Sequence, residues 1–143
     1  MKHQAGLQNV VRFFETISPD SVAQLSSIYT EEVFFKDPFN EVRGIGAVTA
    51  IFAHMFEQVD APRFVITTSV LQDDQAFLTW DFLFRMKRFA REEQCIRGAT
   101  HLRFDADGRV SLHRDYWDAA EELYEKLPLL GSMMRGLKRL ARN

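Results

Sequence analysis

Two ionisable side chains near the end of the sequence have the spacing of a catalytic pair. His113 and Asp115 lie two residues apart in an apolar and aromatic segment that ends at Trp117. If this segment is a β-strand, the three side chains share one face, because alternate residues of a strand point to the same side. A poorly solvated carboxylate among aromatic rings suits a general base, and a neighbouring histidine suits a proton shuttle. The pair predicts removal of a proton beside a carbonyl group, or activation of water.

Asp37 is a third ionisable candidate, expected where a short strand runs into a loop at Pro38. The same position favours a second interpretation, a turn in which the carboxylate accepts backbone N–H groups. His113 has a structural alternative too, a hydrogen bond to a backbone carbonyl. An inward carboxylate at Asp115 is costly unless it is paired, so it bonds His113 or Arg97, or it acts on a ligand.

Other chemistries lack their motifs in this sequence. The four histidines, His3, His54, His101 and His113, have no metal-ligand spacing. There is no glycine-rich phosphate loop, which argues against a bound nucleotide. The single Cys95 excludes an intramolecular disulfide, and nothing in the sequence activates it as a nucleophile. We therefore expect neither a metal nor another cofactor.

Hydrophobic spacing predicts the elements that must position these residues. Apolar residues three or four apart indicate helices at 7–17, 18–29, 44–59, 119–126 and 129–141. Alternating or β-branched and aromatic runs indicate strands at 31–37, 64–71, 77–89, 92–104 and 110–117. Helices kept apart from a run of antiparallel strands predict an α+β fold. We expect one domain over residues 1–143: a cone-shaped, mostly antiparallel sheet wrapped around N-terminal helices at 7–118, and a helical extension at 119–143.

The composition fits an ordinary soluble domain and narrows the function classes. Of 143 residues, 46% are hydrophobic and 27% charged, and the net charge of −2 argues against a nucleic-acid binder. Thirteen phenylalanines predict a bulky core or an apolar cavity. The polar segment 1–6 does not read as a signal peptide, and no run approaches the ~20 apolar residues of a membrane span. We expect a cytoplasmic protein.

Two groups of residues carry a resemblance to a known superfamily. The first is the segment Val33-Phe34-Phe35-Lys36-Asp37-Pro38, followed by Gly44 and a helix. The second is Thr100-His101-Leu102-Arg103-Phe104, then Asp107-Gly108-Arg109-Val110, then Asp115. Together they resemble the nuclear transport factor 2-like superfamily over residues 7–118, and within it the ketosteroid isomerases and the SnoaL-like polyketide cyclases. This fold hosts isomerases, cyclases, epoxide hydrolases, dehydratases and adaptors, so it leaves the activity open.

The resemblance assigns roles to individual residues. Asp37 falls at the general base of ketosteroid isomerases, and Asp115 at the final-strand acid/base of SnoaL-like cyclases. Phe13 and Thr100 fall at the two oxyanion donors of the isomerases. Phe cannot donate a hydrogen bond and a threonine hydroxyl is a weak donor, while each lost donor costs ~10²–10³ in rate. The usual isomerase route is therefore not expected here.

By analogy with this superfamily, the inward faces of the elements enclose an apolar pocket for a hydrophobic small molecule. Its predicted lining residues are Phe13, Ile51, Met55, Trp80, Phe82, Thr100, Leu102 and Trp117. One function is cofactor-independent acid–base catalysis of the isomerase, cyclase, dehydratase or hydrolase type. The alternative is a non-catalytic ligand-binding or interaction module that forms a homodimer through the outer sheet face. Its expected contact residues are Phe77, Leu83, Val110 and Leu112.

The end of the chain is basic and amphipathic, which opens a further alternative. Residues 126–143 contain no acidic residue but five basic ones, Lys126, Arg135, Lys138, Arg139 and Arg142. A basic amphipathic helix at 129–142 is typical of weak contact with a membrane surface. The favoured interpretation is a helix that packs over the cone mouth or a dimer partner, with its bases near the helix C-terminus.

Overall fold

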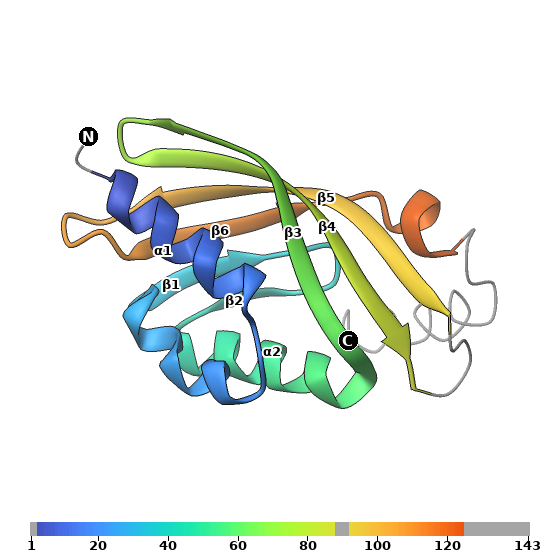
Figure 1. Ribbon diagram of the computed structural model, residues 1–143. Coiled ribbons are helices and arrows are strands. Elements are labelled where there is room, and N and C mark those ends of the chain that lie inside the picture. The colour runs from blue at the N-terminus through green and yellow to red at the C-terminus, as the bar shows by residue number, and fades with distance from the viewer. Residues whose placement is uncertain (1–2, 88–91, 125–143) are drawn as a thin grey trace.

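The computed structural model describes residues 3–87 and 92–124, and Figure 1 shows their arrangement. The helices are α1 (Gln4–Glu15), the 3₁₀ helix η1 (Asp20–Ser27), α2 (Ile45–Gln58) and the short π-helix η2 (Ala120–Tyr124). The strands are β1 (Tyr29–Lys36), β2 (Glu41–Arg43), β3 (Val59–Gln72), β4 (Gln75–Met86), β5 (Glu93–Phe104) and β6 (Val110–Tyr116). The predicted α+β class is confirmed.

One six-stranded sheet, in the order β2-β1-β6-β5-β4-β3, forms the body of the molecule. Its long strands β3, β4 and β5 arch across α1 and α2, so the helices lie within the curve of the sheet (Figure 1). Every strand pair is antiparallel except β1 with β6. This mostly antiparallel, curved sheet over N-terminal helices is the predicted architecture.

The parallel pairing of β1 with β6 places residues that are distant in the sequence side by side in the sheet. Phe35 is opposite His113, and Lys36 is opposite Arg114. Asp37 follows Lys36 directly and Asp115 follows Arg114, so the two aspartates come at the same step along neighbouring strands. The two carboxyl candidates therefore lie at the same end of the sheet.

The first strand differs from its prediction at its beginning. Tyr29 was expected to close the buried stripe of a helix, but it opens β1, where it pairs with Val110. The preceding segment is a 3₁₀ helix, whose first turn is tied by mutual hydrogen bonds between Ser18 and Ser21. A 3₁₀ helix rises further per residue than an α-helix, so η1 spans the same length with fewer residues, and the chain is extended from Tyr29.

Two further differences come from short-range irregularities. Strand β2 was not expected, because it has only three residues and follows the turn at Pro38. Val110 was predicted to point outward for a dimer contact, and this is wrong, since its exposed fraction is 0%. The register of β5 with β6 shifts so that Arg103 is opposite Leu112 but Phe104 is opposite Val110. This β-bulge reverses the alternation and turns Val110 inward.

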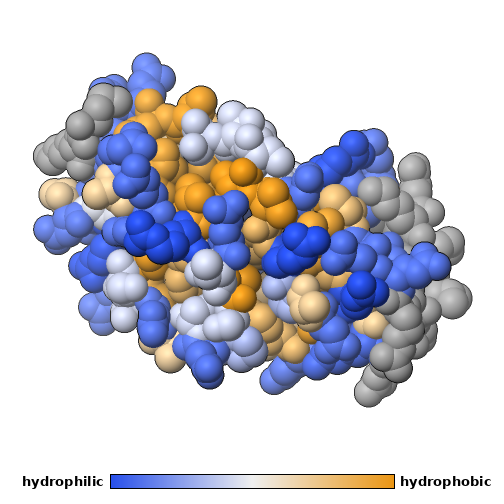
Figure 2. Space-filling view, in the orientation of Figure 1, coloured by the Kyte–Doolittle hydropathy of each residue, from blue (hydrophilic) through white to orange (hydrophobic). Residues whose placement is uncertain are grey.

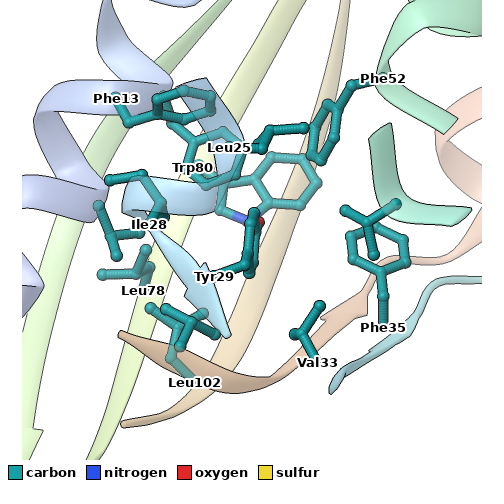
Figure 3. Close-up of a cluster of buried hydrophobic side chains, with 14 of the residues drawn as sticks. Phe13, Leu25, Ile28, Tyr29, Val33, Phe35, Phe52, Leu78, Trp80 and Leu102 are labelled. Carbon is teal, nitrogen blue, oxygen red and sulfur yellow. The ribbon is translucent and has the colours of Figure 1, made fainter. Parts of the chain in front are cut away.

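Aromatic and aliphatic side chains fill the inside of the curved sheet. Figure 3 shows Tyr29 and Trp80 in the middle of this cluster, with Phe13 from α1, Phe52 from α2 and Phe35 from β1 around them. Figure 2 shows that apolar surface gathers in the middle of one face and is bordered by hydrophilic side chains. The thirteen phenylalanines of the sequence thus contribute mainly a packed core, and the polar groups inside it need partners.

Within the described part of the chain, no helix is long and apolar enough to cross a membrane. The predicted helix at 129–141, with its basic face and the expected surface contact of 129–142, lies outside the described residues. Of the predicted helix at 119–126, the described part is η2. Its first turn is capped by the Asp118 carboxylate, which accepts the backbone N–H groups of Ala120 and Glu121.

Candidate active site

Asp115 on β6 is the meeting point of two hydrogen-bonded chains of side chains. Its Oδ1 accepts the Thr100 hydroxyl at 2.6 Å and is hydrogen-bonded to His113 Nε2 at 2.7 Å. The sequence left Asp115 a choice between His113 and Arg97, and the structure pairs it with His113. Arg97 binds Glu122 of η2 instead, at 2.8 Å. The Asp115 side chain is 19% exposed, so one of its oxygens is held inside while the carboxylate still reaches solvent.

His113 is enclosed on all sides and has both ring nitrogens engaged. Its Nδ1 lies 2.8 Å from the hydroxyl of Tyr29, which stands at the start of β1. The rings of Phe14 and Phe35 flank the imidazole, with centroids 5.8 and 4.7 Å away. The His113 side chain is only 4% exposed, so its ring is closed off from solvent.

The second chain runs from β4 through β5. The Trp80 indole N–H donates to the Thr100 hydroxyl oxygen at 2.7 Å, and the Thr100 O–H donates onward to Asp115. The Trp80 ring lies on Gly98 of the neighbouring strand, where a Cβ would stand only 2.4 Å from a ring carbon. Glycine at this position therefore leaves the space in which the indole lies and donates to Thr100. The hydroxyl of Thr100 uses its single proton within this network.

Burial raises the pKa of the Tyr29 phenol well above its ordinary value, and the negative charge of Asp115 raises it further. The phenol therefore stays protonated. Its O–H is a permanent hydrogen-bond donor inside the core, at a residue with an exposed fraction of 0%.

Asp37 is held by its own turn. Its Oδ1 accepts the backbone N–H groups of Phe39 at 2.8 Å and Asn40 at 2.7 Å, and the Asn40 side-chain amide contacts both carboxylate oxygens. This is the turn that the sequence offered as the alternative to a general base. Burial raises the pKa of Asp37, the hydrogen bonds from Phe39 and Asn40 oppose the rise, and the charge of Asp115 adds to it. The negative charges of the two aspartates therefore repel each other across the parallel strand pair.

An aromatic contact spans the same end of the sheet. Phe39 follows Asp37 by two residues and Trp117 follows Asp115 by two, and their rings meet edge to face at 5.5 Å. Both rings are half-buried. The two rings therefore form an apolar surface from the residues that directly follow Asp37 and Asp115 in the chain.

The eight predicted lining residues divide into two groups. Four are buried in the packed core: Phe13, Trp80, Thr100 and Leu102. Four are half-buried and pack at its margin: Ile51, Met55, Phe82 and Trp117.

Two hollows lie on other parts of the surface. One of about 470 Å³ lies between α1 and β3, and one of about 300 Å³ lies beside Pro19 and Pro62. None of the eight predicted residues lines either hollow. The predicted pocket therefore does not coincide with either hollow.

Sequence reasoning missed Tyr29, Gly98 and Phe39 as parts of the site. Tyr29 carried a signal as a polar atom in an apolar stripe, since a buried phenol usually has a hydrogen-bond partner. Gly98 and Phe39 carried no signal, because their roles depend on which strand lies beside them. Among the described residues, no group of three or more His, Cys, Asp or Glu side chains could hold a metal ion.

With this geometry in place, the sequence can be compared with known proteins. Residues 10–113 match the family model of the SnoaL-like domain. The chain belongs to this family. The resemblance to the SnoaL-like branch of the nuclear transport factor 2-like superfamily is thereby confirmed. No curated protein matches the sequence.

Solved structures share the fold of this SnoaL-like domain at low sequence identity. A protein assigned as a SnoaL-like polyketide cyclase from Jannaschia sp. CCS1 has a TM-score of 0.74 at 14% identity, covering 86% of this chain and 92% of that one. An epoxide hydrolase of M. tuberculosis has a TM-score of 0.70 at 12% identity, covering 94% and 96%. A Catenulispora acidiphila protein with a ketosteroid isomerase-like fold, in complex with trimethylamine, has a TM-score of 0.71 at 14% identity, covering 84% and 90%. These likenesses establish the fold.

Proposed function

We propose that this SnoaL-like protein binds a hydrophobic small molecule at the end of the sheet where β1 and β6 finish, and that Asp115 exchanges a proton with it. The observation that carries the proposal is the convergence of two donor chains on a single oxygen of a partly exposed carboxylate. Buried donors that fix one carboxylate oxygen leave the other oriented for a substrate proton. The aromatic pair of Phe39 and Trp117 offers the apolar contact.

The chemistry that fits is general acid–base catalysis without a cofactor. A carboxylate can remove a proton next to a carbonyl group, or it can take one from a water molecule that attacks an electrophile. His113 and Thr100 would stabilise the Asp115 carboxylate between proton transfers. Proteins of the same fold are named as polyketide cyclases and as an epoxide hydrolase, and such reactions need either proton abstraction or water activation.

The test compares the purified protein with Asp115→Asn on two panels of apolar compounds. Cyclic ketones in D₂O report proton abstraction through deuterium incorporation beside the carbonyl, and epoxides report water activation through diol formation. We expect Asp115→Asn to lose ~10²–10⁴ of the rate, with a melting temperature within a few degrees of the wild type. Wild-type turnover in Asp115→Asn would remove Asp115 from the mechanism. If the wild-type protein turns over neither panel, the proposed catalysis is excluded and only ligand binding remains of the proposal.

A second candidate is a non-catalytic module that dimerises through the outer face of the sheet. The observation in its favour is Phe77 on β4, which is 51% exposed and stacks on His101 of β5 with ring centroids 4.5 Å apart. The densely packed interior is consistent with this role as well. Sedimentation of the wild type against Phe77→Ser tests it: we expect a dimer that dissociates in the variant, and a wild-type monomer would exclude it.

A further inference from the structure

The hydrogen bonds around His113 restrict where its protons can be. Nε2 lies 2.7 Å from a carboxylate oxygen of Asp115, and Nδ1 lies 2.8 Å from the Tyr29 hydroxyl. An imidazole can carry its proton on Nε2, on Nδ1 or on both nitrogens. In each form the Tyr29 hydroxyl must either donate a hydrogen bond to Nδ1 or accept one from it. The surrounding contacts do not allow all three forms.

A proton on Nδ1 alone does not fit the contacts. It would leave the bare Nε2 facing Asp115 Oδ1, so that two hydrogen-bond acceptors would stand 2.7 Å apart with no proton between them. As an ionised carboxylate, Asp115 can only accept hydrogen bonds, and its Oδ1 already accepts the Thr100 hydroxyl, so the proton between Oδ1 and Nε2 must come from His113.

A proton on both nitrogens does not fit either. Nδ1–H would then donate to the Tyr29 oxygen, and the phenol O–H would need another acceptor. Within the described part of the chain, the Tyr29 hydroxyl has His113 as its one hydrogen-bond partner. The neighbouring rings of Phe14 and Phe35 offer no oxygen or nitrogen. A fully buried O–H without an acceptor is costly.

We propose that Tyr29 is a positioning residue: its O–H donates to His113 Nδ1 and holds the imidazole neutral with the proton on Nε2, so that His113 serves as a fixed donor to Asp115. This inference rests on the proposed role of Asp115 and assigns Tyr29 to the same site. The Tyr29 O–H and both ring nitrogens of His113 are then satisfied. The raised pKa of the phenol supports the assignment, because Tyr29 remains a donor throughout the neutral range.

The arrangement separates orientation from proton transfer. His113 has no free nitrogen for a substrate, and its Nε2–H already serves Asp115. The proton exchanged with a ligand therefore belongs to Asp115, while Tyr29 acts from β1 through the imidazole. A tyrosine at the start of the first strand thus sets the orientation of a carboxylate at the end of the last one.

Nitrogen NMR of the ¹⁵N-labelled protein tests the inference directly. We expect the wild-type His113 ring to show a protonated Nε2 and an unprotonated, hydrogen-bonded Nδ1. In Tyr29→Phe we expect the Nδ1 signal to move to that of an acceptor without a donor, and the carboxyl carbon signal of Asp115 to move with it. Tyr116→Phe removes an exposed hydroxyl from the outer face of β6 and is the matched control, with unchanged signals.

Each outcome decides a different claim. A wild-type proton on Nδ1, or on both nitrogens, overturns the inference whether or not any variant folds. An Asp115 carboxyl signal that stays unmoved in folded Tyr29→Phe also overturns it. If the wild type turns over a ketone or an epoxide, we expect Tyr29→Phe to lower kcat by up to about 10²-fold with KM little changed. Failure of the proposed function would appear separately, as full turnover by Asp115→Asn.

Discussion

The two aspartates that end neighbouring strands are held in opposite ways. Asp37 is bound by groups within three residues of it in the sequence, the backbone of Phe39 and the backbone and side chain of Asn40. Asp115 is bound by Thr100, from another strand, and by His113, whose own partner Tyr29 comes 84 residues earlier in the chain.

This contrast shows which carboxylate the whole fold positions. The turn around Asp37 would form wherever a similar sequence occurs, since its hydrogen bonds are local. His113 is also close to Asp115 in the sequence, but the network around Asp115, which includes Tyr29, Trp80 and Thr100, exists only when β1, β4, β5 and β6 are assembled. Local satisfaction suits a structural turn, whereas assembly by four strands suits a group whose orientation matters for function.

We expect the largest difference between the two aspartates in the unfolding free energy that is lost when each carboxylate is removed. Asp115→Ala leaves the buried Thr100 O–H and His113 Nε2–H without an acceptor, at ~1–3 kcal/mol each, so we expect a loss of roughly 2 kcal/mol or more in unfolding free energy. Asp37→Ala is the matched control and should cost about 1 kcal/mol, because its donors are half-buried and water can replace the carboxylate. Urea unfolding measures both, and a larger loss in Asp37→Ala would reverse the comparison.

Displacing Trp80 tests how far the support of Asp115 extends. In Gly98→Ala the new Cβ would stand 2.4 Å from the indole, so the ring must leave its place and its bond to Thr100. We expect a loss of about 1–3 kcal/mol from overpacking and a shifted indole N–H signal for Trp80.

Gly46→Ala in α2 is the control for this substitution. No atom lies within 4 Å of its Cβ position, and alanine favours a helix, so this variant should be as stable as the wild type or slightly more. Equal stability of Gly98→Ala and the wild type would show that the ring is not clamped.

The smallest effect concerns pH and Asp37. A raised carboxyl pKa means that the folded protein holds this proton more tightly than the unfolded chain, whose value is near 3.8. The resulting stability is present below 3.8 and is lost as pH rises through the folded pKa. Asp37→Asn keeps the turn acceptor but does not titrate. At neutral pH we expect it to be more stable than the wild type by about 0.5 kcal/mol or less, and the gain should shrink as pH falls toward 3.8.

Unfolding at several pH values measures this difference. Asp105→Asn is the control for the exchange itself, because Asp105 also accepts backbone N–H groups in a turn. A stability gain that grows as pH falls would contradict the assigned sign.

Much of the fold and part of the candidate site could be predicted from the sequence alone. Hydrophobic spacing located the long helices and strands, because burial of one face imposes a period on the residues. It placed His113 and Asp115 on one face of a strand, since strand alternation is a local property of the backbone. The sequence allowed two interpretations of Asp37, a general base or a turn residue, and the structure contains the turn.

Only the tertiary structure decided which groups meet. The partnership of Tyr29 with His113, the place of Trp80 on Gly98 and the common level of Asp37 and Asp115 all depend on strand order and register. The bulge that turned Val110 inward depends on them too. Strand neighbours are chosen by how the whole sheet buries its faces, and that choice has no local signature in the chain. The sequence therefore named a candidate carboxylate, and the assembled sheet supplied the groups that orient it.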